Sequence, residues 1–200
     1  MKRVLALVGM TIASLVAMRG QVIEFEANGL KYQTLTRSGV TIIFAHLPNP
    51  ISDYSIVQVS VSNGSAAPYV IRPEDFSFLR ADGSGVRGVP AKDVVAVLFR
   101  KGTGADVTRL VTTYEAAVYG NAHIRSTNGY EQRRQGALAT TNTRVRAAAT
   151  ASALALVQTK LAPGESTDGA VFFTSIGKPL GPGRLVVRTN TDTFQFNPTP

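Results

Sequence analysis

The chain has 200 residues, of which 44 % are hydrophobic and 17 % charged, a composition that suits one globular domain and excludes a wholly disordered chain. It contains no Cys, so disulfide bonds and thiolate metal sites are excluded. The formal net charge of +8 is concentrated: residues 91–160 hold ten Lys and Arg against four Asp and Glu.

The first twenty residues have the pattern of an export signal. Lys2 and Arg3 precede residues 4–17, a run of 14 residues without charge. The run suits a signal peptide and is shorter than the roughly 17–25 residues of a membrane-spanning helix. Because no A-x-A cleavage motif precedes residue 21, residues 1–20 are interpreted as a signal peptide or a retained N-terminal anchor. We therefore expect an exported protein, whether periplasmic, on the cell surface or secreted.

Short runs of alternating apolar and polar residues predict β-strands on both sides of a central region. In residues 54–63, Ile56, Gln58 and Ser60 share one face, and the valines at 57, 59 and 61 share the other. Turn residues such as Asn63-Gly64 separate the runs. We expect strands at 22–27, 30–36, 40–47, 54–63, 76–80, from 170 onward, and in a last hairpin at 181–190 and 192–198.

The central region has helical patterns instead. Residues 90–99 begin with Pro and predict a short helix. Residues 105–120 carry an amphipathic stripe formed by Val107, Leu110, Val111, Tyr114 and Val118. The Ala- and Arg-rich residues 130–158 predict further helix, with a small-residue face at Leu138, Val145, Ala148, Ser152 and Ala155. Residues 91–160 are thus interpreted as an α-helical insertion between two strands.

The predicted fold class is mainly β: an Ig-like antiparallel β-sandwich with an α-helical insertion. About eight short strands with turns between them are typical of a sandwich. The strand patterns resume after the helical region, so we predict a single domain over residues 21–200, interrupted by the insertion at 91–160.

Three segments resemble bacterial exported Ig-like sandwich domains of unassigned function, of the immunoprotective extracellular antigen type. Their V-x-V-x-N, P-x-D-F-x-L and L-x-P-G-E-S patterns correspond to Val59, Val61 and Asn63; to Pro73, Asp75, Phe76 and Phe78; and to Leu161, Pro163, Gly164, Glu165 and Ser166. The resemblance covers residues 30–90 and 160–197 and skips the helical region. It implies an Ig-like sandwich outside the cytoplasm and supplies no catalytic residues.

The chain carries no motif that predicts catalysis, a cofactor or a metal ion. Residues 83–88, GSGVRG, fit G-x-G-x-x-G, but they lack the strand–helix alternation of a dinucleotide site and are interpreted as a Gly-rich turn. His46 and His123 are the only imidazoles, and no Asp or Glu stands at metal-ligand spacing from them. The Asn63-Gly-Ser glycosylation sequon is explained by turn formation.

The candidate contact residues are Arg133, Arg134, Arg144 and Arg146. They predict either a solvated helix face or contact with an anionic envelope component or a protein partner. Nucleic acid is disfavoured because, apart from Tyr130, aromatic side chains that could stack on bases are missing.

Two functions follow from these predictions. The first is a non-catalytic exported binding or structural module whose basic insertion contacts the envelope or a protein. The alternative is an accessory or catalytic domain that acts on an extracellular polymer such as carbohydrate, which the absence of Trp disfavours.

Overall fold

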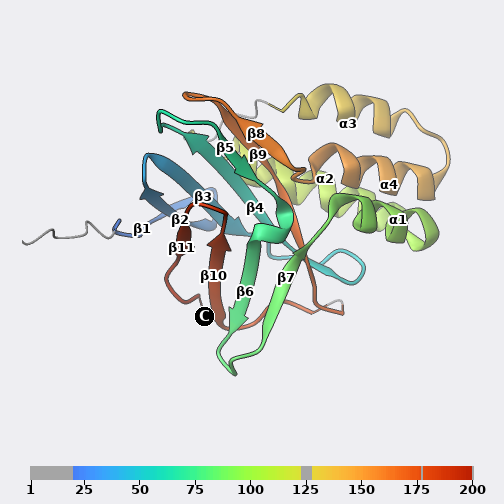
Figure 1. Ribbon diagram of the computed structural model, residues 1–200. Coiled ribbons are helices and arrows are strands. Elements are labelled where there is room, and N and C mark those ends of the chain that lie inside the picture. Colours follow the sequence, from blue (N-terminus) through green and yellow to red (C-terminus); the bar gives the residue numbers. More distant parts are fainter. Residues whose placement is uncertain (1–19, 123–127, 177, 200) are drawn as a thin grey trace, which may run out of the picture.

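A computed structural model describes residues 20–122, 128–176 and 178–199 (Figure 1). The predicted export segment lies outside these residues except for Gly20. The strands are β1 (Ile23–Ala27), β2 (Leu30–Arg37), β3 (Val40–His46), β4 (Tyr54–Asn63), β5 (Tyr69–Ile71), β6 (Phe76–Arg80), β7 (Gly85–Val89), β8 (Thr159–Leu161), β9 (Ser166–Thr174), β10 (Gly183–Arg188) and β11 (Thr193–Gln195). The helices are α1 (Ala91–Lys101), α2 (Gly104–Tyr119), α3 (Tyr130–Leu138) and α4 (Thr143–Leu154), with a 3-10 turn at Pro73–Asp75. Strand exceeds helix, 39 % against 29 %, which confirms the mainly β class.

Nine strands form one antiparallel sheet in the order β1-β2-β3-β4-β9-β7-β6-β10-β11, and β5 pairs with β8 in a separate ribbon. The sheet curls into a half-barrel (Figure 1). A sandwich of the predicted kind has two sheets that pack face to face. Here the two halves are joined, because β9 pairs with β4 on one side and with β7 on the other through Gly88–Phe173 and Val89–Phe172.

One face of the sheet lines the interior of the half-barrel. The valines of β4 point to this side, as their alternation predicts, and are fully buried. Strands far apart in the sequence contribute to the same cluster, and the β5–β8 ribbon covers it. Its largest members are Phe44, Tyr69, Ile71, Phe76, Phe78, Leu161, Phe173, Leu185, Phe194 and Phe196.

The half-barrel is held at its open seam by side chains. Gln33 on β2 and Asn197 after β11 exchange two hydrogen bonds: the Gln33 amide donates to the Asn197 carbonyl at 3.3 Å, and the Asn197 N–H donates to Gln33 Oε1 at 3.0 Å. Arg37 Nη1 also donates to the Thr193 carbonyl at 2.8 Å. The seam is therefore bridged without a continuous strand ladder.

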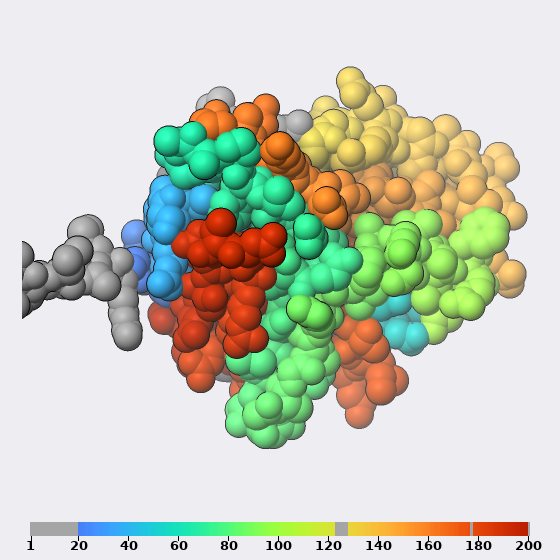
Figure 2. Space-filling view, in the orientation of Figure 1, coloured from blue at the N-terminus to red at the C-terminus, as the bar shows by residue number. Residues whose placement is uncertain are grey.

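The other face of the sheet is covered by the helices, which we call the helical layer (Figures 1 and 2). Tyr54, Ile56 and Phe172 of the sheet share a core with Leu98 of α1 and Leu110 of α2. The stripe predicted for residues 105–120 is the buried face of α2, with Val111 only half-buried. Both faces of β4 and β9 are consequently buried.

Helix α4 lies at the centre of this layer and packs against α1, α2 and α3. Its buried side chains are Ala147, Ala148, Thr150, Ala151, Ala153 and Leu154. Small side chains allow neighbouring helices to approach closely: a Cβ added at Gly102, after α1, would lie 2.6 Å from Ala147 Cβ. The alanine-rich composition of this segment is thus explained by close packing.

Two features of the predicted helical stretch at residues 130–158 are wrong. It is not continuous, because α4 restarts at Asn142, whose Oδ1 accepts the N–H groups of Arg144 at 3.0 Å and Val145 at 3.2 Å. The predicted small-residue face is also misplaced, since Leu138, Val145 and Ser152 are exposed. The true buried face is rotated because three helices surround α4.

The Gly-rich turn predicted at residues 83–88 is only partly correct, because β7 begins at Gly85. Gly88 lies in this strand against the Pro73 carbonyl and the Val171 side chain, where a Cβ would have no room. The glycine therefore permits close packing in the sheet. Because the pairings of β7 are antiparallel, no βαβ unit forms around this motif.

We predict that Ala147→Leu destabilises the protein by about 1–3 kcal/mol or more, because a larger side chain has no space between α4 and Gly102. The exposed Ser152→Leu on the same helix should change the free energy of unfolding by less than about 0.5 kcal/mol. Urea unfolding of both variants checks this. Equal effects would contradict the close packing of α1 on α4.

Candidate functional site

Two of the four predicted contact arginines form hydrogen bonds between elements of the helical layer. Arg133 on α3 donates from Nε and Nη2 to the Ala153 carbonyl of α4, at 3.2 and 2.8 Å. Arg146 Nε donates to the Thr140 carbonyl in the α3–α4 connection at 2.7 Å. A guanidinium that is anchored in this way retains further N–H groups for other partners. Part of the basic charge therefore fixes α3 and its connection on α4.

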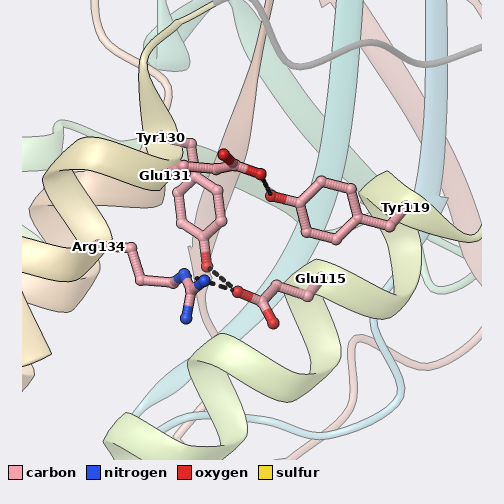
Figure 3. Close-up of polar contacts among 5 residues, drawn as sticks. All are labelled: Glu115, Tyr119, Tyr130, Glu131 and Arg134. Atoms are coloured by element: carbon pink, nitrogen blue, oxygen red, sulfur yellow. Dashed lines mark hydrogen bonds and ion pairs between the residues drawn. The ribbon is translucent and has the colours of Figure 1, made fainter.

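The third, Arg134, belongs to a polar cluster between α2 and α3 (Figure 3). Its Nε lies 2.9 Å from Glu115 Oε1, and the Tyr130 hydroxyl donates to the same oxygen at 3.2 Å. The Tyr119 hydroxyl donates to Glu131 Oε1 at 2.8 Å. Residues four apart lie on one face of a helix, so each helix presents matched groups to the other.

Burial and nearby carboxylates act in the same direction on the tyrosines of this cluster. Burial, followed by the Glu131 carboxylate, raises the pKa of Tyr119 to about 12. Burial and Glu115 likewise raise the pKa of Tyr130 above its ordinary value. Both phenols therefore stay protonated near neutral pH and donate hydrogen bonds to the carboxylates.

A second polar contact connects α2 to the sheet. The Tyr114 hydroxyl donates to Asp168 Oδ2 at 2.7 Å, and both residues are only 1 % exposed. Asn128 Nδ2 donates to the Asp168 carbonyl at 2.6 Å, and its Oδ1 accepts the Tyr130 N–H at 2.9 Å. Burial and then Asp168 raise the pKa of Tyr114 well above its ordinary value. Sequence reasoning missed this contact, for which the only signal is an acidic residue next to an apolar strand segment.

A cavity of about 550 Å³ opens beside this contact, between α3 and the turn from β8 to β9. Its polar lining includes Asn128, Arg133, Thr159, Glu165, Ser166 and Thr167. The volume lies within the range of small-ligand sites. Glu165 Oε2 accepts the Ala162 N–H at 2.7 Å and so closes the turn. The carboxylates of Glu165 and Asp168 both accept hydrogen bonds that hold the local fold. This arrangement differs from an acid–base pair whose carboxyl groups face a substrate.

Three of the four carboxylates in the described helical layer make polar contacts within the layer, but only Asp106 is buried. Asp106 accepts the Thr103 N–H at 2.8 Å and the Thr103 hydroxyl at 2.7 Å in the N-terminal capping box of α2. Glu115 and Glu131 belong to the cluster between α2 and α3, where Glu115 is half-buried and Glu131 is exposed, as Asp93 is. The exposed cations of the layer are Lys92, Arg100, Lys101, Arg109, Arg133 and Arg144, of which Lys101 pairs with Asp53.

The fourth predicted residue, Arg144, is exposed in the first turn of α4, at one end of the helical layer. Here α1 and α3 end and α2 and α4 begin, and we call this the distal end (Figures 1 and 2). Arg100 in the last turn of α1 and Arg109 near the start of α2 lie there too. Within the described part of the chain, none of these three guanidinium groups forms an ion pair.

His46 lies beside a second cavity, of about 350 Å³, at one mouth of the half-barrel. Its ring is half-buried and meets Phe44 and Phe78 edge-on, each at a centroid distance of 5.4 Å. Burial lowers the pKa of His46 to about 4, so the ring is neutral near pH 7. The environment is that of a packing residue at a strand end.

Residues 20–122, 128–176 and 178–199 contain no cluster of three or more His, Cys, Asp or Glu that could hold a metal ion. His123 lies outside these ranges. Among the helices that the structure describes, none has the length and apolar character needed to cross a bilayer. Comparison with protein-family models, with curated proteins and with solved structures gave no match.

We predict that Tyr114→Phe destabilises the protein by about 1–3 kcal/mol, because Asp168 loses a hydrogen-bond donor in a buried position. Tyr119→Phe removes the same group from a side chain that is 53 % exposed and should cost less than about 0.5 kcal/mol. Chemical denaturation of both variants measures the difference. A Tyr114→Phe protein as stable as Tyr119→Phe would mean that the Asp168 contact does not support the fold.

We expect His46 to make stability pH-dependent. Its pKa falls from 6.5 in a free side chain to about 4 in the fold, so below pH 6.5 the unfolded chain binds the proton first. The stabilisation is complete above pH 6.5 and is lost as the pH falls to 4, by about 3 kcal/mol. The His46→Gln protein should lack this pH-dependent loss of stability. Plots of unfolding free energy against pH for the two proteins should therefore converge or cross between pH 7 and 4. Parallel pH profiles would refute it.

Proposed function

We propose that the protein is an exported, non-catalytic binding module whose helical layer contacts an anionic component of the cell envelope. The observation that carries this proposal is the arrangement of charge in the layer. Six Lys and Arg of the described layer are exposed against two carboxylates, Asp93 and Glu131, and Arg100, Arg109 and Arg144 stand at the distal end. A surface of one sign attracts polyanions and concentrates them near the protein.

The other parts of the proposal have separate support. Export is supported by Lys2 and Arg3 before an uncharged run at residues 4–17. A non-catalytic role is supported by the cavity carboxylates of Glu165 and Asp168, which accept hydrogen bonds that hold the fold. These features describe a surface that binds through charge and shape.

We also propose a relation to exported Ig-like domains, which is limited to the pattern of strands and turns. It is supported by the corner at which two of the resembling segments meet. The Gly164 N–H donates to the Asn63 carbonyl at 2.6 Å, and Asn63 Nδ2 donates to the Leu161 carbonyl at 3.1 Å. Gly164, with φ of +83°, occupies the Pro-Gly turn predicted there. On this proposal, the half-barrel differs from an Ig-like sandwich in that the two halves of its sheet are joined through β9.

A second candidate function, saccharide binding, is favoured by the 550 Å³ cavity. Hydroxyl, amide, guanidinium and carboxylate groups line it together, and such groups pair with sugar hydroxyls. Glu165 and Asp168 both border the cavity, but a glycosidase needs two carboxyl groups that reach the substrate. Asp168 is 1 % exposed, so the cavity supports binding of an extracellular saccharide and not its cleavage.

We predict that the protein binds a soluble poly(glycerol phosphate) and not neutral dextran, with affinity that falls as salt rises. Replacing Arg100, Arg109 and Arg144 together by Glu should weaken binding about a hundredfold, at roughly 1 kcal/mol for each cation lost at an anionic surface. Isothermal titration calorimetry at low and high salt measures the affinity.

The control is a triple Glu variant at Arg87, Arg184 and Arg188, which are exposed on β7 and β10. It changes the net charge by the same amount away from the helical layer. We expect it to lower the affinity much less. Equal losses in the two variants would show that overall charge, and not the helical layer, determines binding. No binding to the polymer would refute the proposed function.

A further inference from the structure

The distal end exposes apolar side chains among its arginines. Phe99 is 56 % exposed, and Leu138 and Val145 are each 36 % exposed. Phe99 precedes Arg100 in the last turn of α1, and Val145 follows Arg144 in the first turn of α4. Single exposed apolar residues are ordinary on a protein surface. Here three of them occur at one end of the helical layer, two of them next to an exposed arginine.

Packing brings these residues to the same end. The last residues of α1 approach the first turns of α4 at Gly102 and Ala147. Leu138 ends α3, and the short connection that follows is tied to α4 by the bond from Arg146 to the Thr140 carbonyl. Figure 1 shows these three helix ends together, on the side that points away from the sheet. Their arrangement is fixed by the fold before any partner arrives.

We propose that the distal end docks on the surface of an anionic lipid bilayer, with Phe99, Leu138 and Val145 entering the headgroup region. The inference rests on the proposed function and names its partner. Arg100, Arg109 and Arg144 lie against the lipid phosphates in this arrangement. Shallow burial of a few apolar side chains, combined with cationic groups, is the usual basis of interfacial binding.

The combination of groups distinguishes lipid from other envelope polyanions. A soluble phosphate or sugar polymer offers charge but no apolar layer, so it would engage the arginines and leave Phe99 in water. A bilayer provides both at the required depth, because its anionic headgroups lie directly above hydrocarbon. Contact through preformed helix ends also avoids the cost of ordering a segment on binding.

The chain contains no Trp, so one substitution places a single fluorescent reporter at the distal end. We expect the Phe99→Trp protein to shift its emission to shorter wavelength with phosphatidylglycerol vesicles and to be unaffected by phosphatidylcholine vesicles. Tyr119→Trp is the matched control, since Tyr119 is 53 % exposed at the opposite end of α2. It should show no shift. Because the reporter is local, binding of vesicles through any other part of the chain does not imitate the result.

Charge and apolar contributions are tested separately on the Phe99→Trp background. Arg144→Glu should weaken vesicle binding at least fivefold and make the remainder less salt-dependent. Val145→Ser should weaken it severalfold at all salt concentrations without altering binding to poly(glycerol phosphate). Circular dichroism confirms that each variant retains its helices.

The outcomes separate the inference from the proposed function. If the Phe99→Trp protein binds poly(glycerol phosphate) but its emission does not shift on vesicles, lipid docking is overturned and the proposed function stands. If the protein binds neither poly(glycerol phosphate) nor vesicles, both lipid docking and the proposed function are overturned. An emission shift that appears without vesicles and grows with protein concentration would overturn lipid docking and identify a second copy of the chain as the occupant. A shift caused equally by both vesicle types would overturn the role of anionic lipid.

Discussion

The pairing of β4 with β9 is the interaction on which the rest of the structure depends. The two strands bond along their whole length, from Tyr54 opposite Thr174 to Ser62 opposite Ser166, and both are buried on both faces. One side supplies the interior of the half-barrel, and the other supplies the floor of the helical layer. Because a single ladder serves two cores, neither core can loosen without disturbing the other. The position of Asp168, and with it the Tyr114 contact and the cavity wall, is determined by this ladder.

Local periodicity was sufficient to predict most strands and α2, because alternation along β4 and the stripe on α2 are visible within a few residues. Pairings between distant segments were not visible. Val89 meets Phe172 across more than eighty residues of sequence, and this contact turns two expected sheets into one. The end of α3 was missed although Asn142 is a good capping residue, because an alanine-rich segment has high helix propensity on either side of it. The sequence places the four predicted contact arginines in the helical region, but the contacts of Arg133 and Arg146 depend on backbone carbonyls, which no sequence pattern reports.

The positive charge at the surface of the helical layer comes from an excess of exposed cations, to which the placement of two anions adds. The sequence locates ten Lys and Arg and four Asp and Glu in residues 91–160, but that count does not say which charges meet solvent. In the fold, Asp106 caps α2, and Glu115 and Glu131 join α2 to α3. The bonds of Asp106 and Glu115 therefore also withdraw these two carboxylates from full exposure, whereas Asp93 and Glu131 stay at the surface. Stability and surface potential are coupled here, since a substitution that frees Glu115 would weaken the layer and partly neutralise it.

The chain leaves and re-enters the sheet at almost the same place. Val89 pairs with Phe172, and Ala155 bridges to Ala170, two positions apart on β9. In terms of connectivity, a short turn could replace everything between them. Such a replacement would uncover Tyr54, Ile56 and Phe172, which pack under the helices. The half-barrel thus depends, for the burial of these side chains, on a segment that its strand connectivity does not require.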